Sequence, residues 1–527
     1  MEEQATHINP FLVDYGTPHN TVPFDRITLA DYEEAMMEGI RREDEQIEKL
    51  INDPAEPTFE NTIVALERSG RFLSRVQYAF YNLLSAETSA EMDSIANTIS
   101  PEETEHGNNI TLNEKLFERI KTVYENRKSM PLTAEQQTLL KNTYDSFIDR
   151  GAGLNPHDKE KYRDLSRKLS LLELQYGQNV LNATNNYKKV ITDESLLKGL
   201  PATVLQSARE KAKQNDVEGW CFDLTYPSYG PFMKYADNRE LRKELYMAYN
   251  TKALKEDFDN RPIVKEIVNA RLELARLLGY HDYADYELKD RMAENKSNVY
   301  QLLRQLLDAY KPVAKNEIDA VQEYADKKGA DFQIMPWDWS YYSEKLKDEQ
   351  YNVNDEMLRP YFELEKVKKA VFGLATQLYG LKFVENKEIP VYHPEVNAYE
   401  VFDENGDFLA VFYADFHPRE GKRGGAWMTE YLCQHVDETG DNVRPHISIV
   451  TNFSRPTDTT PALLTFDELT TFLHEFGHSL HGMFANTRFE SLSGTNVWWD
   501  FVELPSQFME NFAVEKEFLR TFAFHYE

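Results

Sequence analysis

The chain has 527 residues, enough for two or more domains or one large two-lobed fold, and its 41% hydrophobic content is typical of a packed globular protein. Its 89 acidic residues against 59 basic ones give a formal charge of −30, which argues against nucleic acid and membrane surfaces as partners. Two cysteines, Cys221 and Cys433, exclude a disulfide framework, and no run of about 18 apolar residues could span a bilayer.

The N-terminus, Met1-Glu2-Glu3-Gln4, has neither the basic nor the apolar region of a secretory signal peptide. We therefore expect a cytoplasmic protein, with a removed leader and a periplasmic location left open. We also expect a monomer.

The first two thirds of the chain read as successive helices. Thr28 is the expected N-cap of a helix that ends near Leu50, and a second helix is expected from Thr58 through Phe80. Further helical patterns span residues 159–181, 237–249, 264–278 and 299–324. Breaks are expected near Pro101, Pro131, Pro156, Pro201 and Pro227. We expect an N-terminal helical region over residues 1–225 and a catalytic region over 226–527.

The pattern changes to short strands after about residue 385. Residues 399–402 and 408–413 are rich in β-branched and aromatic side chains, and Asn405-Gly406 between them predicts a hairpin. Residues 447–450 predict a third strand, and Gly424-Gly425 predicts a turn. A small sheet is therefore expected just before the motif described next.

Residues 474–478 read His-Glu-Phe-Gly-His, the H-E-x-x-H pattern. On a helix, residues four apart share a face, so His474 and His478 can bind one metal ion. Thr465 and Glu468 form a capping box that would start such a helix. The sequence therefore predicts a helix that binds one Zn²⁺ ion, although the ligand types do not separate zinc from cobalt or manganese.

A catalytic zinc site needs a third protein ligand and an open position for water. Glu503 is the best candidate, because the loop through residues 493–495 lets a second helix return beside the first. Asp500 is expected to cap that second helix. It shares one face with Glu503 and Glu510, so Asp500 and Glu510 are candidates to orient the histidines from outside the ligand set.

Glu475 is the expected general base, taking a proton from water at the metal and returning it to the leaving amine. An isolated H-E-x-x-H pattern also arises by chance, and a lone helical Glu such as Glu503 is usually just solvated. His481 is better explained as a core residue, or as one that supports the ligands, than as a ligand itself. No convincing donor for the oxyanion of the tetrahedral intermediate is evident in the sequence.

The chain resembles the thimet oligopeptidase–neurolysin–peptidyl-dipeptidase family of zinc metallopeptidases, and is most similar to its bacterial dipeptidyl carboxypeptidase branch. The residues that carry the resemblance are 9–12, 23–25, 337–342, 421–428, 474–482, 494–496 and 500–507. It implies a mainly α, two-lobed, neurolysin-like fold with a small sheet beside the zinc site and a channel that admits short, unstructured peptides. The family also supplies a His and several Tyr residues from a segment that would follow Glu527. We therefore expect the C-terminal part of the fold to be missing, so that the chain binds zinc but cleaves peptides slowly.

The resemblance implies release of C-terminal dipeptides, with internal cleavage by an oligo-endopeptidase of the same family as the alternative. Gly425, Ala426 and Trp427 are candidates to pair with the substrate backbone as an added strand. Lys422 and Arg423 are weak candidates to bind a substrate carboxylate. A non-catalytic peptide-binding protein and a purely helical scaffold are further alternatives, and the intact motif argues against both.

Overall fold

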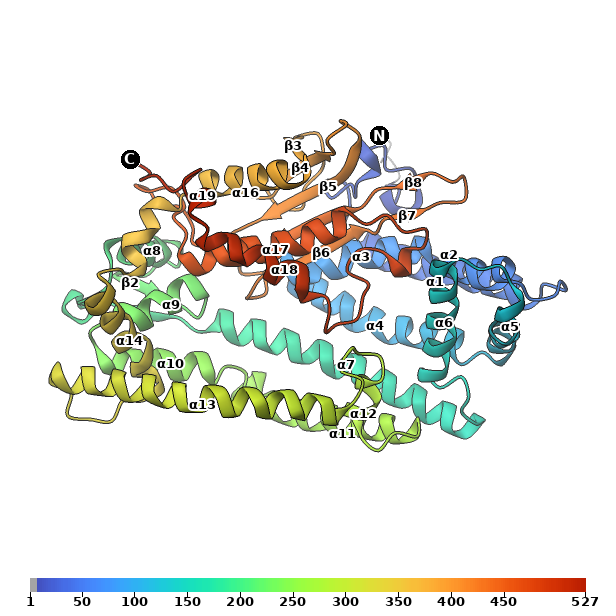
Figure 1. Cartoon of the computed structure of the whole chain (residues 1–527), viewed down its shortest axis with the longest axis horizontal. Coiled ribbons are helices and arrows are strands. Elements are labelled where there is room, and N and C mark those ends of the chain that lie inside the picture. Colours follow the sequence, from blue (N-terminus) through green and yellow to red (C-terminus); the bar gives the residue numbers. More distant parts are fainter. Residues whose placement is uncertain (1–6) are drawn as a thin grey trace, which may run out of the picture.

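The computed structural model describes residues 7–527 and shows a mainly helical molecule built around one five-stranded sheet. In Figure 1 the sheet, α16 and α17 occupy the upper half, and α7, α10, α11 and α13 lie along the lower half. The predicted mainly α fold with a small sheet is confirmed.

The first helix follows the prediction, and the second does not. Helix α1, Leu29–Ile51, starts at a capping box formed by Thr28 and Asp31. The single helix expected from Thr58 to Phe80 is wrong. It is divided into a π-helical segment Phe59–Val64, α2 at Ala65–Arg68 and α3 at Arg71–Ala86. Gly70 separates α2 from α3 with a φ of +71°, a left-handed conformation that a continuing helix cannot contain.

The other four predicted helices are confirmed as α7, α10, α11 and α13. The bounds of the helices up to the sheet are α4 Ala90–Thr111, α5 Glu114–Glu125, α6 Ala134–Asp149, α7 Pro156–Asn186, α8 Ala202–Gln214, α9 Tyr226–Tyr235, α10 Arg239–Asn250, α11 Arg261–Leu277, α12 Tyr283–Leu288, α13 Lys296–Lys327, α14 Pro336–Tyr351, α15 Asp355–Leu358 and α16 Leu364–Tyr379.

Four of the five predicted proline breaks are confirmed. Pro131 lies between elements, Pro156 and Pro227 lie in first helical turns, and Pro201 directly precedes α8. The break at Pro101 is wrong, because this residue lies inside α4. Helix α4 packs against both α1 and α7, and this packing outweighs the hydrogen bond that a proline removes.

The sheet has the strand order β3-β4-β5-β9-β6. Its strands are β3 Lys382–Glu385, β4 Asn397–Phe402, β5 Phe408–Asp415, β6 Trp427–Leu432 and β9 His446–Val450. The predicted hairpin joins β4 and β5, with Gly406 at φ +87°, and the predicted third strand is β9, which runs parallel to β5. Two small ribbons pair β1 Lys189–Ile191 with β2 Trp220–Phe222, and β7 His435–Val436 with β8 Asn442–Val443.

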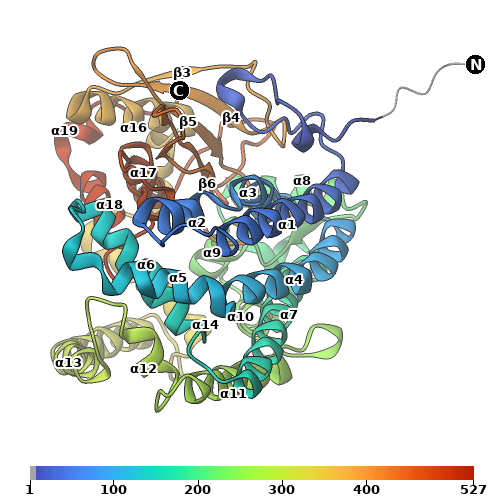
Figure 2. The ribbon, with the colours of Figure 1, turned by 90° about the vertical axis from the view of Figure 1, so that its right-hand side faces the viewer.

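Alternate residues of β5 point into two different hydrophobic cores. Phe412 packs with Phe472 and Phe476 of α17, Phe466–Met483, whereas Val411 and Tyr413 pack with residues of α1 and α3. The N-terminal helices thus cover one face of the sheet and α17 covers the other, as Figure 2 shows. The predicted division at residues 225/226 stays a prediction.

The last two helices follow the sheet and α17. Helix α18, Glu503–Glu510, packs directly against α17 and is followed by α19, Lys516–Leu519. Cys221 and Cys433 are both buried and unpaired. Within residues 7–527, no helix has both the length and the apolar character needed to cross a membrane.

Candidate metal centre

The start of α17 is fixed by one buried carboxylate. The amide of Glu468 donates to the Thr465 hydroxyl at 3.1 Å, and the Glu468 side chain accepts from the Thr465 amide at 2.8 Å, so the predicted capping box is present. Glu468 also accepts a hydrogen bond from the Ser454 amide at 2.7 Å. These bonds tie the helix that carries the H-E-x-x-H pattern to the loop that leaves β9.

The structure brings the three predicted metal ligands together. Oε2 of Glu503 lies 3.3 Å from Nε2 of His474 and 3.2 Å from Nε2 of His478. The ligand atoms of the three residues all lie within 4.8 Å of one another. A tetrahedral ion with bonds of about 2.0–2.1 Å separates its ligand atoms by roughly 3.3 Å, so the two N···O distances fit a zinc ion.

The pKa shifts of His478 and Glu503 also suit a cation. Burial lowers the pKa of His478, which favours the neutral imidazole that binds metals. Burial alone would raise the pKa of the Glu503 carboxyl, but the hydroxyl of Ser506 and the two histidines outweigh it and hold the pKa below its usual range. The site therefore offers the neutral imidazole of His478 and the carboxylate of Glu503 to a cation.

Two neighbours hold the ligands in place. Oε1 of Glu510 lies 2.7 Å from Nδ1 of His474, while Nε2 of His474 lies 3.3 Å from Oε2 of Glu503. The hydroxyl of Ser506, one turn after Glu503, donates to Oε2 of Glu503 at 2.7 Å. Sequence reasoning missed Ser506, although its spacing of three residues from Glu503 on a helix was a usable signal.

Glu475 has the environment of a general base. Only 5% of its surface is exposed to solvent, and its Oε2 atom is buried without a hydrogen-bond partner among the described residues. Burial raises the pKa of Glu475 to about 7, with His474 lowering it and Glu503 raising it by smaller amounts. The unpartnered oxygen can accept a hydrogen bond from a water or substrate that enters the site.

Gly477, inside the H-E-x-x-H pattern, allows α18 to approach. A Cβ on Gly477 would lie 2.5 Å from the carbonyl oxygen of Pro505 and 2.6 Å from Cα of Ser506. Such contacts are shorter than atoms tolerate, so any side chain here would push α18, and Glu503 with it, away from the histidines. No sequence pattern indicated this role, because the close approach exists only once the two helices pack.

The roles predicted for Asp500 are wrong. Helix α18 begins at Glu503 with Val502 at its N-cap, so Asp500 does not cap it. The two carboxylate oxygens of Asp500 instead accept from the amides of Met292 and Ala293 at 3.0 and 2.9 Å, and neither bond orients a histidine. The helix starts later than expected, and Asp500 joins its approach to the segment between α12 and α13.

His481 lies outside the group formed by the three candidate ligands. Its side chain lines a largely apolar hollow together with Tyr379, Phe484 and Phe508, and its buried Nδ1 has no partner among the described residues. His481 belongs to neither group of possible metal ligands among the described residues, which are His474, His478 and Glu503, and His281, Asp282 and Asp285.

The predicted substrate strand lies at an edge of the sheet. Strand β6 begins at Trp427 and pairs with β9 on one side only, and it packs against α17. Gly424 and Gly425 before it are exposed, and Gly425 has a φ of +99°. Lys422 is fully buried and bonded, so its candidacy as a carboxylate ligand is wrong, whereas Arg423 is exposed.

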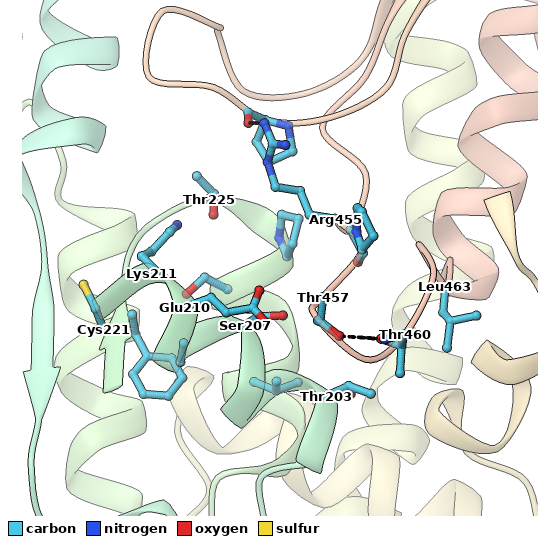
Figure 3. Close-up of a pocket in the computed structure, with 18 of the residues that line it drawn as sticks. Thr203, Ser207, Glu210, Lys211, Cys221, Thr225, Arg455, Thr457, Thr460 and Leu463 are labelled. Atoms are coloured by element: carbon cyan, nitrogen blue, oxygen red, sulfur yellow. Dashed lines mark hydrogen bonds between the residues drawn. The ribbon is translucent and has the colours of Figure 1, made fainter. Parts of the chain in front are cut away.

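A second cavity lies between α8 and the loop that leads into α17 (Figure 3). The loop is joined to α8 because the Asp458 amide donates to Glu210 at 3.0 Å and the Thr459 hydroxyl donates to Gln206 at 2.7 Å. None of the predicted ligands lines this cavity. It therefore marks a contact between α8 and this loop rather than part of the metal centre.

Comparisons with known proteins identify the family of the chain. Residues 232–527 match the protein family described as Peptidase family M3. The chain is 37% identical to dipeptidyl carboxypeptidase of Escherichia coli K12, over 99% of this chain and 77% of that protein. It is 36% identical to the dipeptidyl carboxypeptidase of Salmonella typhimurium, over 98% and 76% of the two chains. It is 35% identical to oligopeptidase A of Escherichia coli K12, over 98% of this chain and 77% of that protein. The resemblance inferred from the sequence is confirmed.

Proposed function

Because the chain belongs to peptidase family M3, we propose that it is a zinc-dependent peptidase that releases dipeptides from the C-terminus of short, unstructured peptides. The observation that carries the proposal is the convergence of His474, His478 and Glu503, with the unpartnered oxygen of Glu475 beside them. The dipeptidyl specificity is supported by the relative at 37% identity that is named dipeptidyl carboxypeptidase.

In this proposal, His474, His478 and Glu503 hold one Zn²⁺ ion, while Glu510 and Ser506 fix the orientation of His474 and Glu503. When bound, zinc supplies Lewis acidity toward water and toward the peptide carbonyl. A substrate backbone pairs with the edge formed by Gly425, Ala426 and Trp427.

Glu475 acts as the general base and then as the general acid. Its carboxylate accepts a proton from the attacking water as the water oxygen bonds to the peptide carbonyl carbon. The proton then passes to the amine nitrogen as the carbon–nitrogen bond breaks. Burial raises the pKa of the Glu475 carboxyl, which helps this group to hold the proton between the two transfers.

An oligo-endopeptidase is the second candidate. The relative named oligopeptidase A is 35% identical over nearly the same span, close to the 37% of dipeptidyl carboxypeptidase. The two candidates share the same chemistry and differ in whether a free substrate C-terminus is required.

The test is mass spectrometry of the products from an unstructured octapeptide, with a free or an amidated C-terminus, after the protein is loaded with zinc. Stepwise loss of dipeptides from the free peptide only is the expected result, and internal cuts in both peptides would favour the oligo-endopeptidase. The Glu475→Gln variant should retain one zinc ion per chain, counted by elemental analysis, and lose about 10²–10⁴-fold in turnover. Unchanged turnover in this variant would contradict the role of Glu475.

A further inference from the structure

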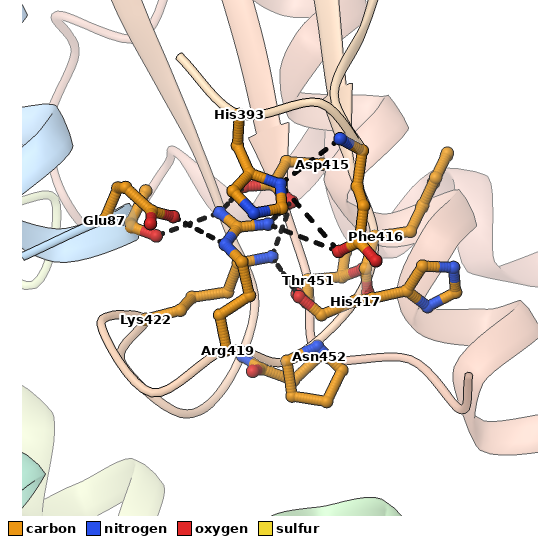
Figure 4. A network of polar contacts seen from close by, with 12 residues as sticks. Glu87, His393, Asp415, Phe416, His417, Arg419, Lys422, Thr451 and Asn452 are labelled. Carbon is orange, nitrogen blue, oxygen red and sulfur yellow. Dashed lines mark hydrogen bonds and ion pairs between the residues drawn. The ribbon is translucent and has the colours of Figure 1, made fainter. Parts of the chain in front are cut away.

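A buried ionic cluster lies at the connection between β5 and β6 (Figure 4). Asp415, the last residue of β5, is completely buried, and its two oxygens are 2.7 Å from the guanidinium nitrogens of Arg419. Nζ of Lys422 lies 2.6 Å from Oδ1 of the same carboxylate. The Tyr392 hydroxyl donates to Oδ2 at 2.7 Å.

Lys422 uses all three of its protons inside the protein. Besides Asp415, its ammonium donates to the carbonyl oxygens of His417 at 2.6 Å and Thr451 at 3.0 Å. Burying an ammonium group is costly unless every proton is bonded and the charge is paired. Lys422 meets both conditions, and its bonds join the end of β5 to Thr451, the residue that follows β9.

The residues on either side of Lys422 are also held by backbone hydrogen bonds. The Thr88 amide donates to the carbonyl of Gly421 at 2.8 Å, and the Arg423 amide donates to the carbonyl of Ser85 at 2.9 Å. A Cβ on Gly421 would lie 2.5 Å from the carbonyl oxygen of Thr88, so the connection rests directly on the end of α3. Arg419 adds bonds to Glu87 at 2.6 Å and to the carbonyl of Ala86 at 3.0 Å.

These bonds, called the clamp below, hold residues 421–423, and the chain continues from them into the exposed residues that precede β6. The side-chain amide of Asn452 donates to the carbonyls of Arg423 and Gly425 at 2.9 and 2.7 Å. Two successive exposed glycines would otherwise sample many backbone conformations, and fixing them on peptide binding would cost conformational entropy. A clamp that already holds them reduces this cost.

The C-terminal half of β6 is closed to a peptide. The side-chain amide of Asn82, on α3, donates to the carbonyl of Glu430 at 2.7 Å, and the Thr429 hydroxyl donates to Asn82 at 2.6 Å. The open part of the edge is therefore the stretch from Gly424 to Met428, directly after the clamp.

We propose that Lys422 is a positioning residue, which holds residues 424–427 in the conformation that pairs with a peptide backbone. The inference rests on the proposed function, because it assumes that peptides bind along this edge. Lys422 acts through the loop and contacts neither the metal ligands nor the peptide.

The test measures peptide binding without turnover, in zinc-loaded Glu475→Gln protein, by fluorescence anisotropy of a labelled octapeptide. Adding Lys422→Met should raise the Kd about tenfold, corresponding to the loss of one or two backbone hydrogen bonds. Adding Asn452→Ala, which removes two loop bonds without leaving a buried charge unpaired, should also raise it. The zinc content should stay at one ion per chain in both.

The matched control is Lys159→Met in the same background. Lys159 is another buried lysine, on α7, and donates to the carbonyl of Leu112 at 3.1 Å and to Glu114 at 3.2 Å. Its variant should bind the peptide with unchanged Kd. Equal weakening by Lys159→Met and Lys422→Met, or unchanged binding in both the Lys422 and Asn452 variants, would overturn the inference.

A second readout uses peptides in which one backbone amide at a time is replaced by an ester. At the positions that pair with the edge, the ester should weaken binding to the Glu475→Gln protein and have little further effect once Lys422→Met is present. An equal ester effect in both proteins would overturn the inference while leaving the proposed function intact. A third outcome is that the unsubstituted zinc-loaded protein cleaves no peptide and its Glu475→Gln variant binds none. That outcome would overturn the proposed function and the inference together.

Discussion

Helices α17 and α13 carry the same kind of amphipathic signal and have opposite environments. Eleven residues of the 18-residue α17 are buried, whereas only three of the 32 residues of α13 are, all near its C-terminal end. Helix α17 lies against the sheet and α18, but α13 packs against α14 and α12 at the outer edge of the molecule (Figures 1 and 2). Apolar side chains exposed on α13 include Leu302, Leu303, Leu306, Leu307, Tyr310 and Val313.

The comparison separates the formation of a helix from its burial. Spacing in the sequence predicts a helix in both places, because both segments repeat apolar residues at three and four positions. Burial depends on partners from other parts of the chain, and α17 has them on more than one side. We therefore expect α17 to be sensitive to substitution and the exposed face of α13 to be tolerant.

The largest effect is expected at Phe476. This side chain is fully buried in α17 and lies about 6 Å, between ring centroids, from Phe372, Phe383 and Phe412. Phe476→Ala should lower the free energy of unfolding by about 3–5 kcal/mol, because it leaves a cavity between the helix and the sheet. Urea unfolding followed by circular dichroism would measure this loss. A loss below about 1 kcal/mol would contradict the tight packing of α17.

A smaller effect is expected at Glu510, which orients His474. Glu510→Gln should weaken zinc binding about 10–100-fold while leaving the fold intact, because the acceptor on Nδ1 of His474 loses its charge. Competition with a chelator of known affinity would measure the change. Glu517→Gln, at an exposed position beyond the site, is the control and should bind zinc normally.

The pH dependence of stability tests the half-buried carboxyl of Glu430, which lies beside Gly482 of α17. A Cβ on Gly482 of α17 would lie 3.1 Å from Oε1 of Glu430, and burial raises the pKa of Glu430 from its ordinary 4.5 to about 7. The folded protein therefore keeps a proton that the unfolded chain releases, so this contribution to stability is full below pH 4.5 and is lost as the pH rises through about 7.

Glu430→Gln, which cannot ionise, should raise the melting temperature relative to the unsubstituted protein, and by more at pH 8 than at pH 5. Differential scanning calorimetry at the two pH values would measure both gains. Glu404→Gln, in the exposed hairpin turn, provides the control. A gain that is larger at pH 5 would contradict the sign of the shift.

The smallest effect is expected on α13. The Leu307 side chain is 57% exposed, so Leu307→Gln should change the free energy of unfolding by no more than about 0.5 kcal/mol. The same urea titration as for Phe476→Ala would measure it. A loss of several kcal/mol would show that Leu307 is buried in solution and would remove the contrast between the two helices.

Much of the metal centre could be predicted from the sequence because its parts are local. Two histidines four residues apart meet on any helix, and Thr465 with Glu468 caps that helix through side chains three residues apart. The β4–β5 hairpin was equally local, since Asn-Gly sets the turn. The same local reasoning failed at Pro101, where packing on both sides keeps a helix continuous through a proline, and at Asp500, where the helix starts two residues later than expected.

The sequence by itself determined the mainly helical fold, the hairpin and the residues able to bind a metal, because these follow from spacing within one segment. Only the tertiary structure decided which of them meet. It brought Glu503 of α18 to the two histidines of α17, required a glycine at position 477 where the two helices meet, and buried Lys422 against Asp415 and Thr451. These contacts join residues that are close in space through the packing of separate elements, and no local pattern encodes such a distance.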